Sequence, residues 1–253
     1  MEVALQAAKE AGACIMRYYQ KSYDVRNKSR NNPVTTADFA ANDCIRTIIQ
    51  TAFPDDGWLS EETQDSPDRL VKSRVWVIDP IDGTEEFITG EPEFAVSIAL
   101  TVDGSPVVGV LYNPATQERF HAQVGGGAFY NGVKTDCSTC RELSAARMLV
   151  SQNEQRKGLL DALIPLVGDV HYVGSVACKL GRLIMGKSDL YVTLRPKNEW
   201  DFCAGDVILR EAGGVLWSQA GKPIQYNKPV VKQVDGLYAG NPYLVRQILR
   251  QSL

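Results

Sequence analysis

The hydrophobic pattern at the start of the chain predicts two helices separated by a polar segment. Over 2–20, apolar side chains recur at spacings close to one helical turn. The polar segment 21–33, KSYDVRNKSRNNP, predicts a loop. Thr35 or Thr36 then caps a second predicted helix over about 37–52, whose isoleucines fall on one face.

The next part of the chain predicts strands joined by short turns. The run of bulky apolar and β-branched residues at 74–79 is typical of a buried strand. Two further strand-like segments, 94–101 and 106–112, are separated by an Asp-Gly turn and predict a hairpin. The glycine-rich segment 125–132 predicts another hairpin, so this half of the chain favours an antiparallel sheet.

The second half alternates strand and helix patterns, which favours a layered α/β architecture. The predicted strands lie at 147–151, 169–173, 189–194, 215–218 and 236–240, and the predicted helices at 154–166, 175–186, about 201–213 and 241–251. We expect a single catalytic unit over 1–253, with an antiparallel sheet in about 1–140 and a smaller mixed sheet in about 141–253.

The composition is that of an ordinary soluble globular chain, with 44% apolar and 23% charged residues among 253. The net charge of −3 and the lack of a basic stripe argue against a nucleic-acid polymer as partner. No apolar run approaches the roughly 18 residues of a membrane span, so no membrane partner is expected. Charged residues interrupt 1–20, which does not resemble a signal peptide, and we predict a cytoplasmic protein.

The cysteines are expected to be reduced thiols, as in most intracellular proteins. Cys137 and Cys140 form the only C-x-x-C pair. A zinc site would need a second pair or nearby histidines, and His121 and His171 have no ligand-like partner. The sequence therefore assigns neither zinc nor redox chemistry to this pair.

The sharpest chemical signal is the segment Asp79-Pro-Ile81-Asp82-Gly83-Thr84, in which an apolar strand delivers two carboxylates into a turn. Such a pair is costly at a buried strand end unless a cation compensates it. Hard divalent cations prefer oxygen ligands, and Asp79, Asp82 and the Ile81 carbonyl can supply them. If Gly83 and Thr84 open a helix, their N–H groups form an anion site beside the metals. An ordinary Asp-rich surface turn is the alternative.

Three further acidic residues strengthen the metal interpretation, although each has a simpler explanation by itself. Glu61 lies in the motif SEET, which could be a solvated loop. Asp38 lies in the first turn of a predicted helix, where it would complement the helix dipole. Asp201 lies at a strand-to-helix junction and could be a simple N-cap. Their joint occurrence with the Asp79 motif favours one shared site.

On these motifs, the sequence resembles the inositol monophosphatase superfamily of metal-dependent phosphatases. The resemblance lies, in order over most of the chain, in VTTAD (34–38), SEET (60–63), WVIDPIDGTEEF (76–87), GS (174–175) and EWDFCAGDVILREAGG (199–214). It implies an αβαβα layered fold, a homodimer and inhibition by lithium.

The resemblance also implies the metal ligands, for two or three Mg²⁺ ions. Glu61, Asp79 and the Ile81 carbonyl would bind one ion. Asp79, Asp82 and Asp201 would bind a second, and Glu61 would touch a weaker third.

The same resemblance implies that Asp38, Thr84 and Glu61 are the catalytic residues. Asp38 and Thr84 would orient and deprotonate the attacking water, and the Gly83 and Thr84 amides would hold the phosphate. Two-metal activation of water needs no protein nucleophile, so the scarcity of histidine does not weaken this prediction.

The substrate is predicted to be a small phosphate ester, and the sequence favours one branch of the superfamily. Inositol-phosphate enzymes carry a sugar-binding Glu seven residues before the Trp-Asp aspartate, where this chain has Leu194. The segments 84–87 and 93–100 resemble the 3′(2′),5′-bisphosphate nucleotidases, which convert 3′-phosphoadenosine 5′-phosphate to AMP and phosphate.

Gly174, Ser175, Lys179 and Arg195 are the further predicted substrate-binding residues. Lys179 and Arg195 could neutralise a second phosphate, or could be a solvated helix residue and a surface ion-pair partner. Inositol monophosphatase and fructose-1,6-bisphosphatase-type activities remain the alternatives.

Two other classes of function compete with a Mg²⁺-dependent phosphomonoesterase. A metal- or nucleotide-binding module without turnover is disfavoured because every predicted catalytic position is present. A phosphodiesterase or nuclease is disfavoured because the chain lacks a basic stripe.

Overall fold

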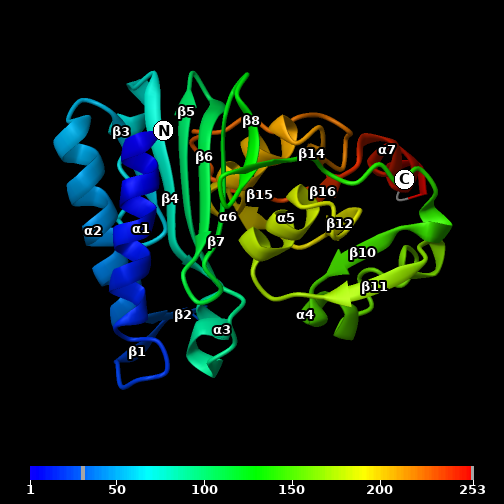
Figure 1. The fold of residues 1–253 in the computed structure, drawn as a ribbon, viewed down its shortest axis with the longest axis horizontal. Coiled ribbons are helices and arrows are strands. Elements are labelled where there is room, and N and C mark those ends of the chain that lie inside the picture. The colour runs from blue at the N-terminus through cyan, green and yellow to red at the C-terminus, as the bar shows by residue number, and fades with distance from the viewer. Residues whose placement is uncertain (30–31, 252–253) are drawn as a thin grey trace.

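Five alternating layers of helices and sheets make up the chain in the computed structural model, which describes residues 1–29 and 32–251 (Figure 1). Two of the layers are sheets, and the three helical layers are α1 (Glu2–Met16) with α2 (Thr36–Ala52), α5 (Val176–Ile184) with α6 (Glu199–Glu211), and α7 (Pro242–Gln251). This arrangement confirms the layered α/β fold and the αβαβα order that the resemblance implied.

The larger sheet has seven strands and is antiparallel except at one edge. In spatial order its strands are β3 (Gly57–Ser60), β4 (Arg74–Asp82), β5 (Ala95–Val102), β6 (Ser105–Asn113), β7 (Glu118–Gln123), β8 (Gly127–Tyr130) and β9 (Val133–Thr135). Only β3 and β4 run parallel among these neighbours. The antiparallel prediction is therefore correct apart from that pair. β3 and β7 were not predicted, because neither GWLS nor ERFHAQ has a strong strand pattern.

Side chains along β4 alternate between two of the three hydrophobic cores of the described residues. Val75 and Val77 face the core that α5 and α6 share with both sheets. Trp76 and Ile78 point to the opposite face, where α1 and α2 cover the sheet. β4 is thus buried on both faces, and its charged end at Asp79 and Asp82 is delivered into the interior between the layers.

The smaller sheet is mixed, as predicted. Its strands in spatial order are β11 (Asp169–Tyr172), β10 (Arg147–Val150), β12 (Leu190–Thr193), β16 (Leu237–Gly240) and β14 (Val215–Ser218). β10 is parallel to β11 and β12, whereas β16 is antiparallel to β12 and β14. Helix α7 packs on its outer face and completes the third core.

The predicted helix over 154–166 is wrong. The chain forms only α4 (Gln152–Arg156), followed by turns and a short 3₁₀ helix at Ile164–Leu166. Gly158 has a positive φ of 66°, which ends any α-helix, and Pro165 cannot donate an amide hydrogen bond within one. The apolar positions that suggested a helix are instead buried by turns: Leu160 and Leu163 are almost fully enclosed.

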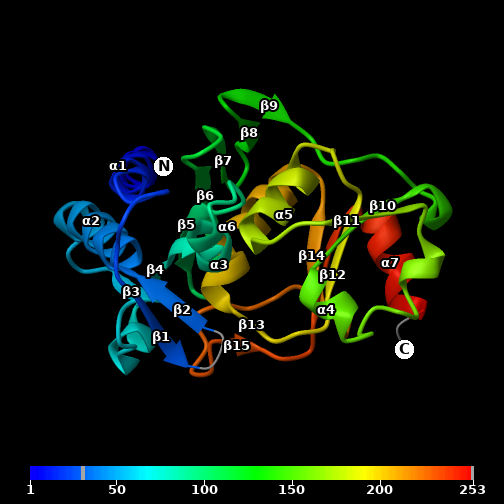
Figure 2. The ribbon, with the colours of Figure 1, turned by 90° about the horizontal axis from the view of Figure 1, so that it is seen from below.

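The predicted polar loop at 21–33 is also different. It contains β1 (Val25–Ser29), which pairs antiparallel with β2 (Asn32–Thr35), while Arg30 and Asn31 lie outside the described residues. This β1–β2 hairpin, α3 (Thr84–Thr89) and α4 all lie at one edge of the molecule (Figures 1 and 2).

The remaining elements are short. β13 (Lys197–Asn198) pairs with β15 (Lys232–Gln233), and 3₁₀ helices lie at Pro67–Val71 and Leu143–Ala145. Within 1–29 and 32–251, no helix has both the length and the apolar character needed to span a membrane.

Candidate active site

A cavity of about 1050 Å³ opens at the edge that carries α3 and α4. Its walls come from both halves of the chain, and ten predicted site residues line it: Glu61, Asp79, Ile81, Asp82, Gly83, Thr84, Gly174, Ser175, Arg195 and Asp201. Two predicted site residues, Asp38 and Lys179, do not line the cavity.

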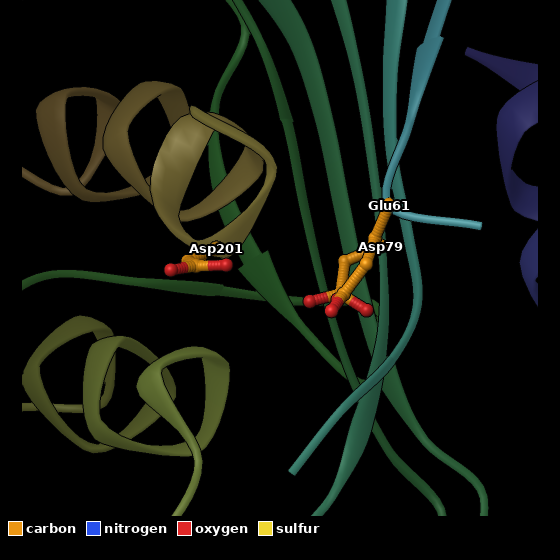
Figure 3. A group of neighbouring side chains, drawn as sticks. All are labelled: Glu61, Asp79 and Asp201. Atoms are coloured by element: carbon orange, nitrogen blue, oxygen red, sulfur yellow. The ribbon is translucent and has the colours of Figure 1, made fainter. Parts of the chain in front are cut away.

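Parallel pairing of β3 with β4 brings two acidic residues together. Ser60 is in register with Ile78, so the next residues along the chain, Glu61 directly after β3 and Asp79 within β4, lie side by side. Asp201 reaches toward them from the first turn of α6 (Figure 3). One carboxylate oxygen from each of these three residues lies within 4.8 Å of the others. Segments far apart in the sequence therefore converge on one acidic triplet.

Helix capping aims two of the predicted site carboxylates. Asp38 Oδ2 accepts hydrogen bonds from the Thr35 amide (2.8 Å) and the Thr35 hydroxyl (2.6 Å). Asp201 Oδ2 accepts a hydrogen bond from the Asn198 amide at 2.9 Å. Each completes a capping box, and each leaves its Oδ1 atom for other partners. Asp201 is therefore the third residue of α6 and not the N-cap considered from the sequence, and Asp38 has the predicted place in the first turn of its helix. In both residues the capping box orients the carboxylate and leaves room for a role in the site.

Asp82 is held differently and lies outside the triplet. Its Oδ2 atom accepts hydrogen bonds from the Ser175 hydroxyl and from the Ala177 amide (2.6 Å). Because Ser175 also caps α5, Asp82 joins the metal motif to the start of that helix. The structure therefore groups Glu61, Asp79 and Asp201 more closely than the predicted ligand set of Asp79, Asp82 and Asp201.

The turn after β4 depends on Gly83. Its φ of +96° lies in the region that favours glycine, and an added Cβ would lie 2.6 Å from the Glu93 carbonyl oxygen. Gly83 thereby allows the chain to turn into α3, which begins at Thr84. The Thr84 hydroxyl lies 3.1 Å from both Asp38 Oδ1 and the Ile81 carbonyl oxygen, and its single proton can be donated to either. This contact brings Asp38 to the cavity through Thr84.

Burial and the nearby negative charges raise the pKa of three of the site carboxylates, Asp38, Asp79 and Asp201. Burial raises the pKa of Asp79 well above its usual range, and the charges of Glu61, Asp82 and Asp201 raise it further. Burial likewise raises the pKa of Asp201 to about 7, with Glu61 and Asp82 adding to the shift and Lys197 opposing it. Burial also raises the pKa of Asp38. A hard divalent cation would relieve this repulsion, and the all-oxygen donor set fits Mg²⁺.

The raised pKa of Asp201 predicts a measurable effect on stability. Between about pH 4 and 7 the folded protein binds more protons than the unfolded chain, so its free energy of unfolding falls as pH rises. In EDTA at about pH 8, Asp201→Asn should therefore be more stable than the wild type by roughly 2 kcal/mol. Thermal unfolding from about pH 4 to 8 measures the difference, which should shrink towards the acid end.

Asp55→Asn is the matched control, since Asp55 is an exposed turn residue. Equal stability of Asp201→Asn and wild type at every pH would contradict the assigned repulsion.

Lys28 is a site residue that the sequence analysis missed. Its ammonium nitrogen lies 2.7 Å from Glu61 Oε1 and 2.7 Å from Glu62 Oε1. Burial raises the pKa of Glu62 to about 7, against the lowering effect of Lys28. No local motif marks Lys28, because the β1–β2 hairpin alone brings it to the acidic residues. A cation at Glu61 would compete with this ammonium group.

Lys179 does not have the predicted position. Its side chain is 1% exposed, and its ammonium group donates hydrogen bonds to the Gly174 carbonyl and, at 3.4 Å, to the Ser175 carbonyl. Burial lowers the pKa of Lys179 to about 8. The prediction that it binds a substrate phosphate is therefore corrected: Lys179 supports the Gly174-Ser175 segment from behind the cavity wall.

Comparison with known proteins agrees with the fold. The model of the inositol monophosphatase family matches residues 1–252. The chain belongs to the inositol monophosphatase family. Members of this family are metal-dependent phosphatases, so the protein is a metal-dependent phosphoric monoester hydrolase.

Individual members of the family cover nearly the whole chain. Inositol monophosphatase 3 of Solanum lycopersicum is 34% identical over 87% of this chain and 86% of its own. The Nus factor SuhB of Escherichia coli is 33% identical over 98% of this chain and 94% of its own. The crystal structure of the suhB protein of Bartonella henselae superposes with a TM-score of 0.87 at 30% identity, covering 99% of this chain and 97% of that one.

Proposed function

We propose that this family member hydrolyses a small phosphate monoester at the cavity around Glu61, Asp79 and Asp201. The convergence of these three carboxylates within 4.8 Å is the observation that carries the proposal. They would hold Mg²⁺ together with Asp82 Oδ1 and the Ile81 carbonyl, and we propose two or three ions. When bound, the ions stabilise charge on the phosphoryl oxygens and favour deprotonation of water.

The chain's own residues complete the proposed mechanism. The Thr84 hydroxyl donates a hydrogen bond to Asp38 Oδ1, so a lone pair of the hydroxyl oxygen is free to accept a proton from the attacking water. As Thr84 takes the water proton, its own hydroxyl proton passes to Asp38. Asp38 is suited to hold that proton, since burial has raised its pKa. The amides of Gly83 and Thr84 would hold the phosphate, and Gly174 and Ser175 would line the side from which the leaving group departs.

Two substrate classes are the leading candidates for this site. The relatives described above are inositol monophosphatases and SuhB proteins, which supports an inositol phosphate at least as well as the bisphosphate nucleotide preferred from the sequence. Leu194 stands where inositol-phosphate enzymes have a sugar-binding Glu, and this favours a nucleotide. A related Staphylococcus aureus enzyme, 26% identical, has been crystallised with 2′-AMP. A sugar bisphosphate is a third candidate.

Phosphate release from a defined panel tests the proposal. The wild type is assayed with Mg²⁺ on inositol 1-phosphate, 3′-AMP, 3′-phosphoadenosine 5′-phosphate and fructose 1,6-bisphosphate, and the four substrates are ranked by kcat/KM. We expect release that EDTA abolishes and added Mg²⁺ restores. No release from any of the four, or release that EDTA leaves unchanged, would overturn the proposed function.

We propose that the chain acts as one catalytic unit, as a homodimer in the cytoplasm, and that lithium inhibits it. Light scattering on the purified protein tests the dimer, and the phosphate assay with added LiCl tests the inhibition.

A further inference from the structure

The cavity has a basic wall in addition to its acidic triplet. Arg156 of α4, the adjacent Lys157, Arg195 and Lys197 all line it, and all come from the second half of the chain. The acidic triplet needs cations and a reacting phosphate, and these four positive side chains are not among its ligands. They therefore add positive charge to the same cavity, and Lys197 lies near enough to Asp201 to oppose the rise in its pKa.

None of these four side chains takes part in an ion pair within the described part of the chain. Other arginines behave differently. Arg69, Arg74, Arg147, Arg182 and Arg210 each pair with an aspartate or glutamate. The basic wall thus keeps its charge available to a ligand, whereas these five arginines pair with acidic partners of the protein itself.

A buried carboxylate fixes the geometry of this wall. Glu154 of α4 is 1% exposed, and its Oε1 atom accepts hydrogen bonds from the Leu194 amide (2.8 Å) and the Arg195 amide (3.3 Å). These bonds join α4 to the segment after β12, so that Arg156 and Arg195 are held on one wall. Enclosing Glu154 is costly, and positioning the wall gives a physical reason for it.

We propose that the basic wall of Arg156, Lys157, Arg195 and Lys197 binds a second phosphate group of the substrate. This inference rests on the proposed phosphatase function and narrows its substrate class to phosphate monoesters that carry a further phosphate. Arginine can bind such a group through two parallel hydrogen bonds, and lysine adds a point charge.

Two substrates that differ only in the second phosphate, 3′-phosphoadenosine 5′-phosphate and 3′-AMP, provide the test. For the wild type, Arg195→Ala, Arg195→Lys and Arg156→Ala, the kcat/KM measured with the bisphosphate is divided by the value measured with the monophosphate. We expect a wild-type ratio of at least about 10, falling about tenfold in each alanine variant, as charged hydrogen bonds contribute roughly this much. Arg195→Lys should recover part of the ratio. Lys9→Ala, on the outer helix α1, is the control and should keep the wild-type ratio.

Glu154→Gln and Glu154→Ala test the positioning role. Glutamine keeps an oxygen that can accept the two amide hydrogen bonds, so this variant should retain most of the ratio, whereas Glu154→Ala should lose it. Circular dichroism and the rate with 3′-AMP report whether Glu154→Ala still folds. If Glu154→Ala does not fold, the Arg195 and Arg156 variants alone test the second-phosphate site.

The outcomes separate the two proposals. The second-phosphate site is overturned if the enzyme hydrolyses 3′-AMP as fast as the bisphosphate and if Arg195→Ala and Arg156→Ala leave the ratio of the two kcat/KM values unchanged. This result would leave the phosphatase function intact. Absence of phosphate release from every ester overturns the proposed function itself.

Discussion

Asp79→Asn is expected to reduce phosphate release by roughly 10³-fold or more, since charge stabilisation at the phosphoryl group dominates such reactions. Asp79 is the central member of the acidic triplet, and its pKa is raised by burial and by Glu61, Asp82 and Asp201 together. Asparagine keeps the size of the side chain and an oxygen, but it removes one negative charge from the group that would hold the cations.

The same variant should lose the stabilisation that Mg²⁺ gives to the wild type. A ligand that binds only the folded state raises the free energy of unfolding according to its concentration relative to its Kd. Titration of Mg²⁺ during thermal unfolding should therefore raise the Tm of the wild type and leave that of Asp79→Asn almost unchanged. Activity and Tm measure the same loss of cation binding by independent routes.

Asp55→Asn is again the control, because it makes the same chemical change at an exposed turn. It should retain wild-type activity and the wild-type response to Mg²⁺. An Asp79→Asn protein that keeps both would show that the triplet does not hold the catalytic cations.

Thr84→Ala is expected to lower kcat by about 10²–10⁴-fold, the range found when a positioned proton-transfer group is removed. The Thr84 hydroxyl lies 3.1 Å from Asp38 Oδ1, and Asp38 does not itself line the cavity. Any proton that Asp38 accepts from the site must therefore pass through Thr84. Removing the hydroxyl breaks this connection while leaving the carboxylates of the triplet in place.

Thr84→Ser and Asp38→Asn complete this experiment. Serine retains the hydroxyl and should keep kcat within about tenfold of the wild type, whereas alanine should not. Asp38→Asn should reproduce most of the alanine defect, and combining it with Thr84→Ala should add little, because the two residues act as one unit. A Thr84→Ala enzyme as fast as Thr84→Ser would sink the proposed proton path.

Periodic patterns predicted most of the secondary structure, because burial dictates residue type at each face of an element. The run of apolar and β-branched residues at 74–79 became β4, and the helical spacing at 37–52 became α2. The pattern failed over 154–166, where buried leucines occur in turns around Gly158 rather than in a helix. Apolar spacing reports burial, and burial does not require regular structure.

Much of the site could also be predicted from the sequence, because several of its residues are neighbours along the chain. Asp79, Ile81, Asp82, Gly83 and Thr84 are adjacent in the chain, so their chemistry is visible as a motif. The positions of Asp38 and Asp201 near helix starts were also visible in the sequence, and their carboxylates are oriented by residues three positions earlier. Such interactions depend on only a few consecutive residues.

Other features depend on the pairing of distant segments, which no local motif records. The parallel register of β3 and β4 puts Glu61 beside Asp79, and the β1–β2 hairpin brings Lys28 to the same place. The prediction for Lys179 was wrong because spacing along α5 cannot tell which side of a helix faces the cavity.

The sequence by itself determined the layered architecture, the acidic motifs and the family, since these follow from periodicity and from neighbouring residues. Only the tertiary structure decided which carboxylates meet, that Lys179 supports the wall from behind, and that Glu154 joins two basic segments into one wall of the cavity. The physical reason is that contacts between remote segments depend on how the layers pack, and packing is a property of the whole chain.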